Sequence, residues 1–212
     1  KNIYSSTLTL KKGEYEPLGV SPDFERLKQD LGDLEISSSL SLKGQNLKTR
    51  GLGEALHFIS HYDYTPLYLK ILDISNNGLV ADDLRMLRIL PFLETVKLSH
   101  NPLGDEGAEI LEEISTFLTL ESLVVKNTAL SKGGLIPLLK ITSLKVLDIG
   151  ENPALSQEAP ESLADLLQDS SHLKLKGDTL LELALGNFFE DQRAFQSALR
   201  FYEQAAVKQD LL

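Results

Sequence analysis

Residues 69–79 read Leu-Lys-Ile-Leu-Asp-Ile-Ser-Asn-Asn-Gly-Leu, and this stretch decides the fold. It fits the pattern L-x-x-L-x-L-x-x-N-x-L at every fixed position when isoleucine is allowed for leucine. The same spacing returns from Leu93, Leu120 and Leu144, so successive copies lie 24, 27 and 24 residues apart. Four consecutive copies at a nearly constant period indicate a solenoid, in which stacked units bury a continuous core.

The apolar spacing within each copy predicts a short parallel strand. Leu72 and Ile74 lie two positions apart, which places both on one face of a strand and turns the residue between them to the other face. Asn77 follows the strand, where its side-chain amide can satisfy backbone groups at the bend. Each copy therefore predicts an apolar inner face, a polar outer face and a turn stabilised by asparagine.

Segments with helical apolar spacing separate the predicted strands. The expected helices are residues 83–90, 106–117, 132–141 and 159–167. Before the second of these, Gly104 permits a turn, and Asp105 and Glu106 place negative charge at the helix N-terminus. The predicted fold class is α/β: a right-handed horseshoe with a parallel sheet inside and helices outside.

Weaker copies flank the four strong ones. The positions of the copy before them are Leu40, Leu42, Gln45 and Leu47. The positions of the copy after them are Leu173, Leu175, Asp178 and Leu180. Residues 40–180 are therefore expected to hold about six units. Residues 1–39, with an alternating strand and one amphipathic helix, are expected to form an N-terminal cap that covers the edge of the sheet.

Residues 181–212 lack a strand pattern and predict a helical hairpin, with helices over about 180–191 and 194–208. Its small and aromatic residues resemble the tetratricopeptide signature: Leu185, Gly186, Asn187, Phe189, Phe195, Ala198, Tyr202 and Ala205. The segment departs from that signature at Glu182, where a large apolar residue is usual, and at the turn 192–194. Two interpretations stay open: a C-terminal cap, or the first unit of a longer array.

Composition narrows the classes of partner and chemistry. The chain has 212 residues, 21 Lys and Arg against 31 Asp and Glu, and a formal net charge of −10. This balance disfavours nucleic acid and anionic membranes and favours a protein partner with a basic surface. No cysteine is present, which excludes disulfides, thiol catalysis and thiolate zinc sites. We expect a nuclear or cytoplasmic protein, and we expect the chain from Lys1 to be part of a longer one.

A search for catalytic and metal-binding residues finds little. His57 and His61 are four residues apart and would share one helix face, but they lack the glutamate of H-E-x-x-H and are expected to be solvated. No phosphate-binding glycine motif is present, and no nucleophile is placed beside His100. We therefore expect no enzyme activity, no cofactor, no metal site and no small-molecule substrate.

The outward positions of the predicted strands form polar columns across the concave sheet, and we expect a protein partner to bind there. In this alignment Lys174 shares a column with Asp148. The predicted contact residues are Asp73, Ser75, Asn76, Lys97, Ser99, His100, Val124, Lys126, Asn127, Asp148, Glu151 and Lys174. The alternative is that these positions are merely solvated and that the partner binds the convex wall or the ends.

The repeat block resembles the ribonuclease-inhibitor class of leucine-rich repeats, which implies protein binding without catalysis. More narrowly, residues 23–32, 72–77, 101–105 and 147–153 are similar to the leucine-rich region of Tonsoku-like scaffolds. That resemblance implies a docking module of a nuclear factor in replication-coupled DNA repair. The hairpin departs from it, because further leucine-rich units would be expected there. The alternative function is the substrate-recognition module of an adaptor or of a host-directed effector.

Overall fold

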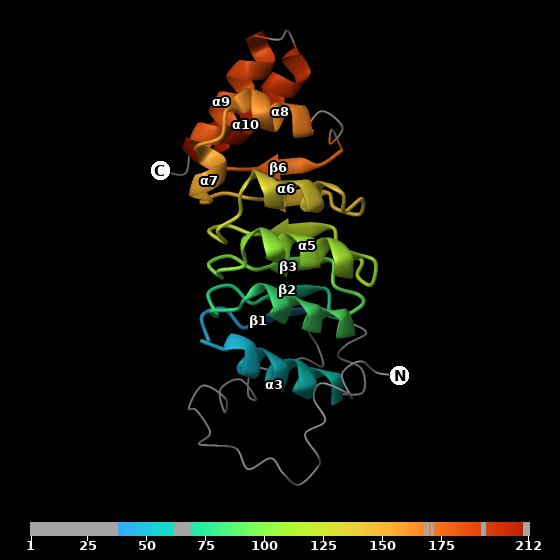
Figure 1. Ribbon diagram of the computed structural model, residues 1–212. Coiled ribbons are helices and arrows are strands. Elements are labelled where there is room, and N and C mark those ends of the chain that lie inside the picture. The colour runs from blue at the N-terminus through green and yellow to red at the C-terminus, as the bar shows by residue number, and fades with distance from the viewer. Residues whose placement is uncertain (1–37, 62–68, 168–169, 171, 192–193, 210–212) are drawn as a thin grey trace.

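The computed structural model describes residues 38–61, 69–167, 170, 172–191 and 194–209. These residues form one parallel sheet whose strands follow chain order, with a helix or turn after each strand (Figure 1). The strands are β1 (Ser39–Ser41), β2 (Ile71–Asp73), β3 (Thr95–Lys97), β4 (Ser122–Val124), β5 (Val146–Asp148) and β6 (Lys174–Lys176). The predicted N-terminal cap lies almost entirely outside the described residues.

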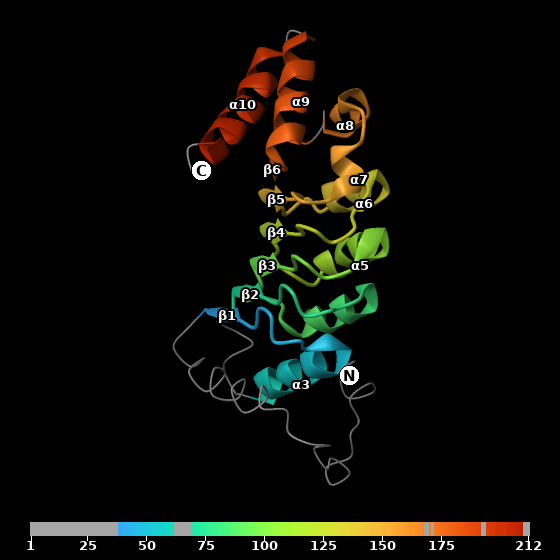
Figure 2. The ribbon, with the colours of Figure 1, turned by 90° about the vertical axis from the view of Figure 1, so that its left-hand side faces the viewer.

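The helices form a second layer on one side of the sheet, as Figure 2 shows for α3, α5 and α6. The described elements of this layer are α3 (Lys48–His61), the 3-10 helix η2 (Ala81–Ile89), α5 (Gly104–Ser115), α6 (Lys132–Leu139), α7 (Pro153–Ser156) and α8 (Pro160–Leu167). We call the other side of the sheet the open sheet face. It corresponds to the concave side of the predicted horseshoe.

The core between the layers is built from the inward strand positions. Leu72, Val96, Leu123 and Leu147 are in register on neighbouring strands, and all four are fully buried. Ile74, two residues after Leu72, is also fully buried, as the spacing predicted. The buried apolar residues form one cluster from Leu40 to Phe201, so the apolar core is shared along the stack.

A buried asparagine links three of the four central units to the unit before it. Asn101 donates from Nδ2 to the carbonyl oxygens of Ile74 (3.0 Å) and Leu98 (2.7 Å). Its Oδ1 accepts from the backbone N–H groups of Asn77 (3.0 Å) and Leu79 (3.1 Å). The predicted role of this position is therefore confirmed, and it extends across two units.

One helix differs from its prediction in type. Residues 81–89 form a 3-10 helix, whereas the apolar spacing predicted an α-helix over 83–90. At ~2.0 Å per residue a nine-residue 3-10 helix spans ~18 Å, about the length of the twelve-residue α-helix α5 at ~1.5 Å per residue. The helix of the 24-residue unit therefore spans about the same length as the helix of the 27-residue unit, although it contains fewer residues.

The C-terminal hairpin consists of α9 (Thr179–Asp191) and α10 (Phe195–Gln209). The helices approach closely at Gly186, where an added Cβ would lie 2.6 Å from the Tyr202 ring. Glu182, where the sequence departs from the tetratricopeptide signature, is buried and accepts from the N–H of Gly177 at 3.0 Å. This bond ties α9 to the end of β6.

Candidate functional site

The strand register arranges the side chains of the open sheet face in four columns. Each column runs across the strands and contains one residue from every described unit. The first holds Ser39, Ile71, Thr95, Ser122, Val146 and Lys174, and the second holds Ser41, Asp73, Lys97, Val124, Asp148 and Lys176. Continuing the register, the third holds Lys43, Ser75, Ser99, Lys126, Gly150 and Asp178, and the fourth holds Gly44, Asn76, His100, Asn127, Glu151 and Thr179.

The predicted alignment of the last unit was wrong by two residues. β6 pairs Lys174 with Val146 and Lys176 with Asp148, so Lys174 belongs to the first column and not beside Asp148. A slip of two residues keeps every side chain on the same face, and Leu173 and Leu175 are both buried apolar residues that fit either register.

Two predicted contact residues contribute almost no surface. Ser75 and Ser99 are buried, with only 4% and 8% of their surface exposed. Both side chains are short. Asp73 Oδ1 accepts a hydrogen bond from the N–H of Ser75 at 3.1 Å, so the larger side chain of Asp73 lies beside Ser75. The other ten predicted contact residues are exposed or half-buried on the open sheet face.

The fourth column lies where the backbone turns in the left-handed region. Asn76, His100, Asn127 and Glu151 have φ between 48° and 59°, and Gly44 at the equivalent position has φ 70°. Glycine and asparagine tolerate this conformation, whereas histidine and glutamate do so at a cost. The turn places His100 and Glu151 at the edge of the open sheet face, where both residues are exposed.

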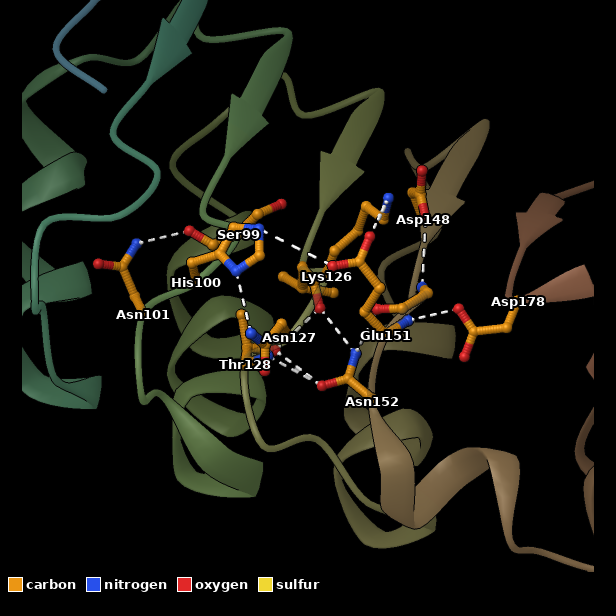
Figure 3. Close-up of polar contacts among 12 residues, drawn as sticks. Ser99, His100, Asn101, Lys126, Asn127, Thr128, Asp148, Glu151, Asn152 and Asp178 are labelled. Atoms are coloured by element: carbon orange, nitrogen blue, oxygen red, sulfur yellow. Dashed lines mark hydrogen bonds and ion pairs between the residues drawn. The ribbon is translucent and has the colours of Figure 1, made fainter. Parts of the chain in front are cut away.

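Polar contacts join these columns across neighbouring units (Figure 3). His100 Nδ1 lies 2.9 Å from Asn127 Nδ2, and His100 Nε2 lies 3.9 Å from Glu151 Oε2. Lys126 Nζ lies 2.6 Å from Glu151 Oε1. The hydrogen bond to Glu151 raises the pKa of Lys126, and the charges of Glu151 and Asp148 add to this effect against partial desolvation. Lys126 is thus already paired within the protein.

Sequence reasoning missed a second row of charges, one residue before each of four strands. Lys70 Nζ lies 2.7 Å from Glu94 Oε1, and Lys145 Nζ lies 2.7 Å from Glu121 Oε1. The hydrogen bond to Glu94 raises the pKa of Lys70. We call these four residues the edge row. The sequence contains a pattern that could have predicted this row. The second residue of all four strong copies is charged, and the four include both lysine and glutamate.

Charge on the open sheet face is nearly balanced. The four columns carry five lysines against four carboxylates: Lys43, Lys97, Lys126, Lys174 and Lys176 against Asp73, Asp148, Glu151 and Asp178. The chain as a whole carries −10. Part of the acidic excess lies on the helical side, for example at Glu106 and Glu109 of α5, which are exposed. The charge of the open sheet face therefore does not support the prediction that the partner has a basic surface.

The described residues contain no group of three or more histidine, aspartate or glutamate side chains that could hold a metal ion. The side chains of His57 and His61 lie outside the described part of the chain. Among the helices that the structure describes, none combines the length and the apolar character needed to cross a bilayer.

Comparison with known proteins bears on the fold. Residues 90–111 match the family model described as Leucine Rich repeat. Among solved structures, the chain is similar to the tropomodulin C-terminal domain from Caenorhabditis elegans, with 13% identity, 88% of this chain and 95% of that chain covered, and a TM-score of 0.36. A comparison with curated protein sequences found no match. The recurring motif and the parallel sheet define a leucine-rich-repeat α/β solenoid.

Proposed function

We propose that the protein is a non-catalytic interaction module that binds a protein partner on its open sheet face. One observation carries the proposal: ordered columns of side chains run across this face, and the core does not use them. A solenoid presents many side chains to one partner in this way, and leucine-rich repeats generally serve protein binding. The proposal includes no enzyme activity, because no nucleophile with a paired base was found in the sequence.

The cellular setting that we propose is the arm of a nuclear scaffold in replication-coupled DNA repair. Its support is the resemblance of residues 72–77, 101–105 and 147–153 to the leucine-rich region of Tonsoku-like scaffolds. Within this proposal the C-terminal hairpin is a cap of the solenoid. The hydrogen bond from Gly177 N–H to Glu182 and the contact between Arg200 Nη1 and the Leu173 carbonyl oxygen (3.4 Å) support that role, since both tie the hairpin to β6.

Site-specific photo-crosslinking in cells tests the proposal. A photoreactive amino acid at Val124, in the middle of the open sheet face, is expected to capture a partner that the same group at Glu109 on α5 does not. A captured replication or repair protein supports the scaffold, and a ubiquitin-ligase subunit supports an adaptor instead. Capture from Glu109 but not from Val124 would move the binding site to the helical side.

A further inference from the structure

The first column of the open sheet face, at the start of the strands, is free of charge on β2 to β5. Four neighbouring first-column residues on β2 to β5 and one second-column residue carry no ionisable group, and we call them the uncharged stripe: Ile71, Thr95, Ser122, Val124 and Val146. All five are half-buried, so each keeps some surface open to solvent. Ile71 and Val146 stand at the two ends of this run. The stripe ends at Lys174 on β6.

Charged residues border the uncharged stripe on both sides, and eight of them form four ion pairs within the protein. On one side lies the edge row, with Lys70 bonded to Glu94 and Lys145 bonded to Glu121. On the other side, Lys97 Nζ lies 4.0 Å from Asp73 Oδ2, and Lys126 is bonded to Glu151. Because these charges neutralise one another, they would contribute to the choice of partner more than to net electrostatic attraction.

This arrangement has the anatomy of a protein interface. An uncharged, partly apolar centre surrounded by a polar rim is the usual distribution of residues in a contact surface. We infer that the uncharged stripe is the centre of the docking surface and that its occupant is an amphipathic α-helix of the partner protein. The inference deepens the proposed function and rests on it, since it names the residues and the partner chemistry at the same face.

The dimensions of the uncharged stripe favour a helix lying across the strands. The uncharged stripe crosses four strands about 4.8 Å apart and so spans roughly 14 Å, the length of about 10 residues of α-helix. A helix of this kind carries apolar residues along one face and charged residues on both flanks. The apolar face would meet the stripe, and the flanks would meet the edge row and the Asp73–Lys97 pair. A strand added in sheet register would have to bind at β1 or β6, because the inner strands are paired on both sides.

Two matched pairs of substitutions separate apolar contact from charge. Ile71→Thr with Val146→Thr makes the stripe polar while keeping β-branched side chains that suit a strand. Asp73→Asn with Lys97→Gln removes one ion pair from the rim of the same face with little change in size. Both pairs lie outside the buried core, and circular dichroism with thermal unfolding of the intact chain checks that each variant folds.

The probe is a displayed library of random peptides about 18 residues long, panned on the intact chain. We expect enriched peptides with apolar residues at helical spacing. Their affinity should fall roughly tenfold in the threonine pair and less than about threefold in the charge-neutral pair. It should also change little with salt, because apolar contact is not screened.

Other outcomes overturn the inference in distinguishable ways. Enriched peptides with alternating apolar residues would indicate an extended occupant. Enriched charged peptides that lose affinity in Asp73→Asn with Lys97→Gln, or in high salt, would refute the stripe and leave the open sheet face as the binding surface. Peptides insensitive to both pairs, or the enrichment of none, would count against the stripe and the proposed function together.

Discussion

Asn101 offers the most direct test of how the units are joined. Its side chain is fully buried and makes hydrogen bonds with two backbone N–H groups and two carbonyl groups at 2.7–3.1 Å. Asn101→Ala removes all four bonds and leaves four buried backbone groups unsatisfied. At ~1–3 kcal/mol for each buried unsatisfied group, with part recovered by water entering the space, the free energy of unfolding should fall by at least ~3 kcal/mol.

The effect is measured by urea denaturation of the intact chain, followed by circular dichroism. Asn101→Thr provides a graded comparison, because Thr128 occupies the equivalent position of the next unit and bonds the carbonyl oxygen of Val125 at 2.9 Å. This variant should keep the local bond and lose those to the preceding unit, so its loss should be intermediate. Asn187→Ala is the control, since Asn187 is exposed. Equal losses for Asn101→Ala and Asn187→Ala would refute the role of the buried asparagine.

Three further predictions concern single features. Asp105→Ala should cost ~0.5–2 kcal/mol of stability, measured by denaturant unfolding, because Asp105 Oδ1 accepts from the N–H of Ser131, the N-cap of α6, at 2.8 Å; an unchanged midpoint would contradict this. Ala129→Gly should raise stability by up to ~1 kcal/mol, since Ala129 has φ 62°; a lower melting temperature would contradict the strain. The hydrogen bond to Glu190, followed by desolvation, raises the pKa of Tyr202 from 10.0 to about 12. The folded state therefore keeps the phenol proton that the unfolded state loses, so stability is full below pH 10 and falls as pH rises toward 12. The difference in phenolate absorbance between the wild-type chain and Tyr202→Phe isolates the titration of Tyr202 and should show it near pH 12. A difference that titrates near pH 10 would exclude the hydrogen bond.

The repeat motif predicted much of the solenoid because its spacing reflects geometry. Alternating leucines fix which face of a strand is buried. Asn77, Asn101 and Asn152 mark the turn after three of the strands, and Thr128 occupies the same position after β4. The register of β1 to β5 follows from those positions. The last unit has no asparagine at the equivalent position, Leu180, and this left two registers with the same buried face.

The state of individual side chains on the open sheet face could not be read from the sequence. Lys126 was predicted only as an outward-pointing contact residue, and the structure pairs it with Glu151 of the next unit. Ser75 and Ser99 were placed on the correct face, but burial depends on the neighbouring side chains and not on alternation alone. The edge row was open to prediction, because its residues recur at one motif position.

The central claim is that the partner binds the open sheet face, and thiol protection tests it most directly. Since the chain contains no cysteine, Val124→Cys and Glu109→Cys each place one reactive thiol on opposite sides of the molecule. Adding the partner captured by photo-crosslinking should slow alkylation of the thiol at position 124 by roughly tenfold or more and leave the thiol at position 109 unchanged. Protection at position 109 with free access at position 124 would contradict the claim.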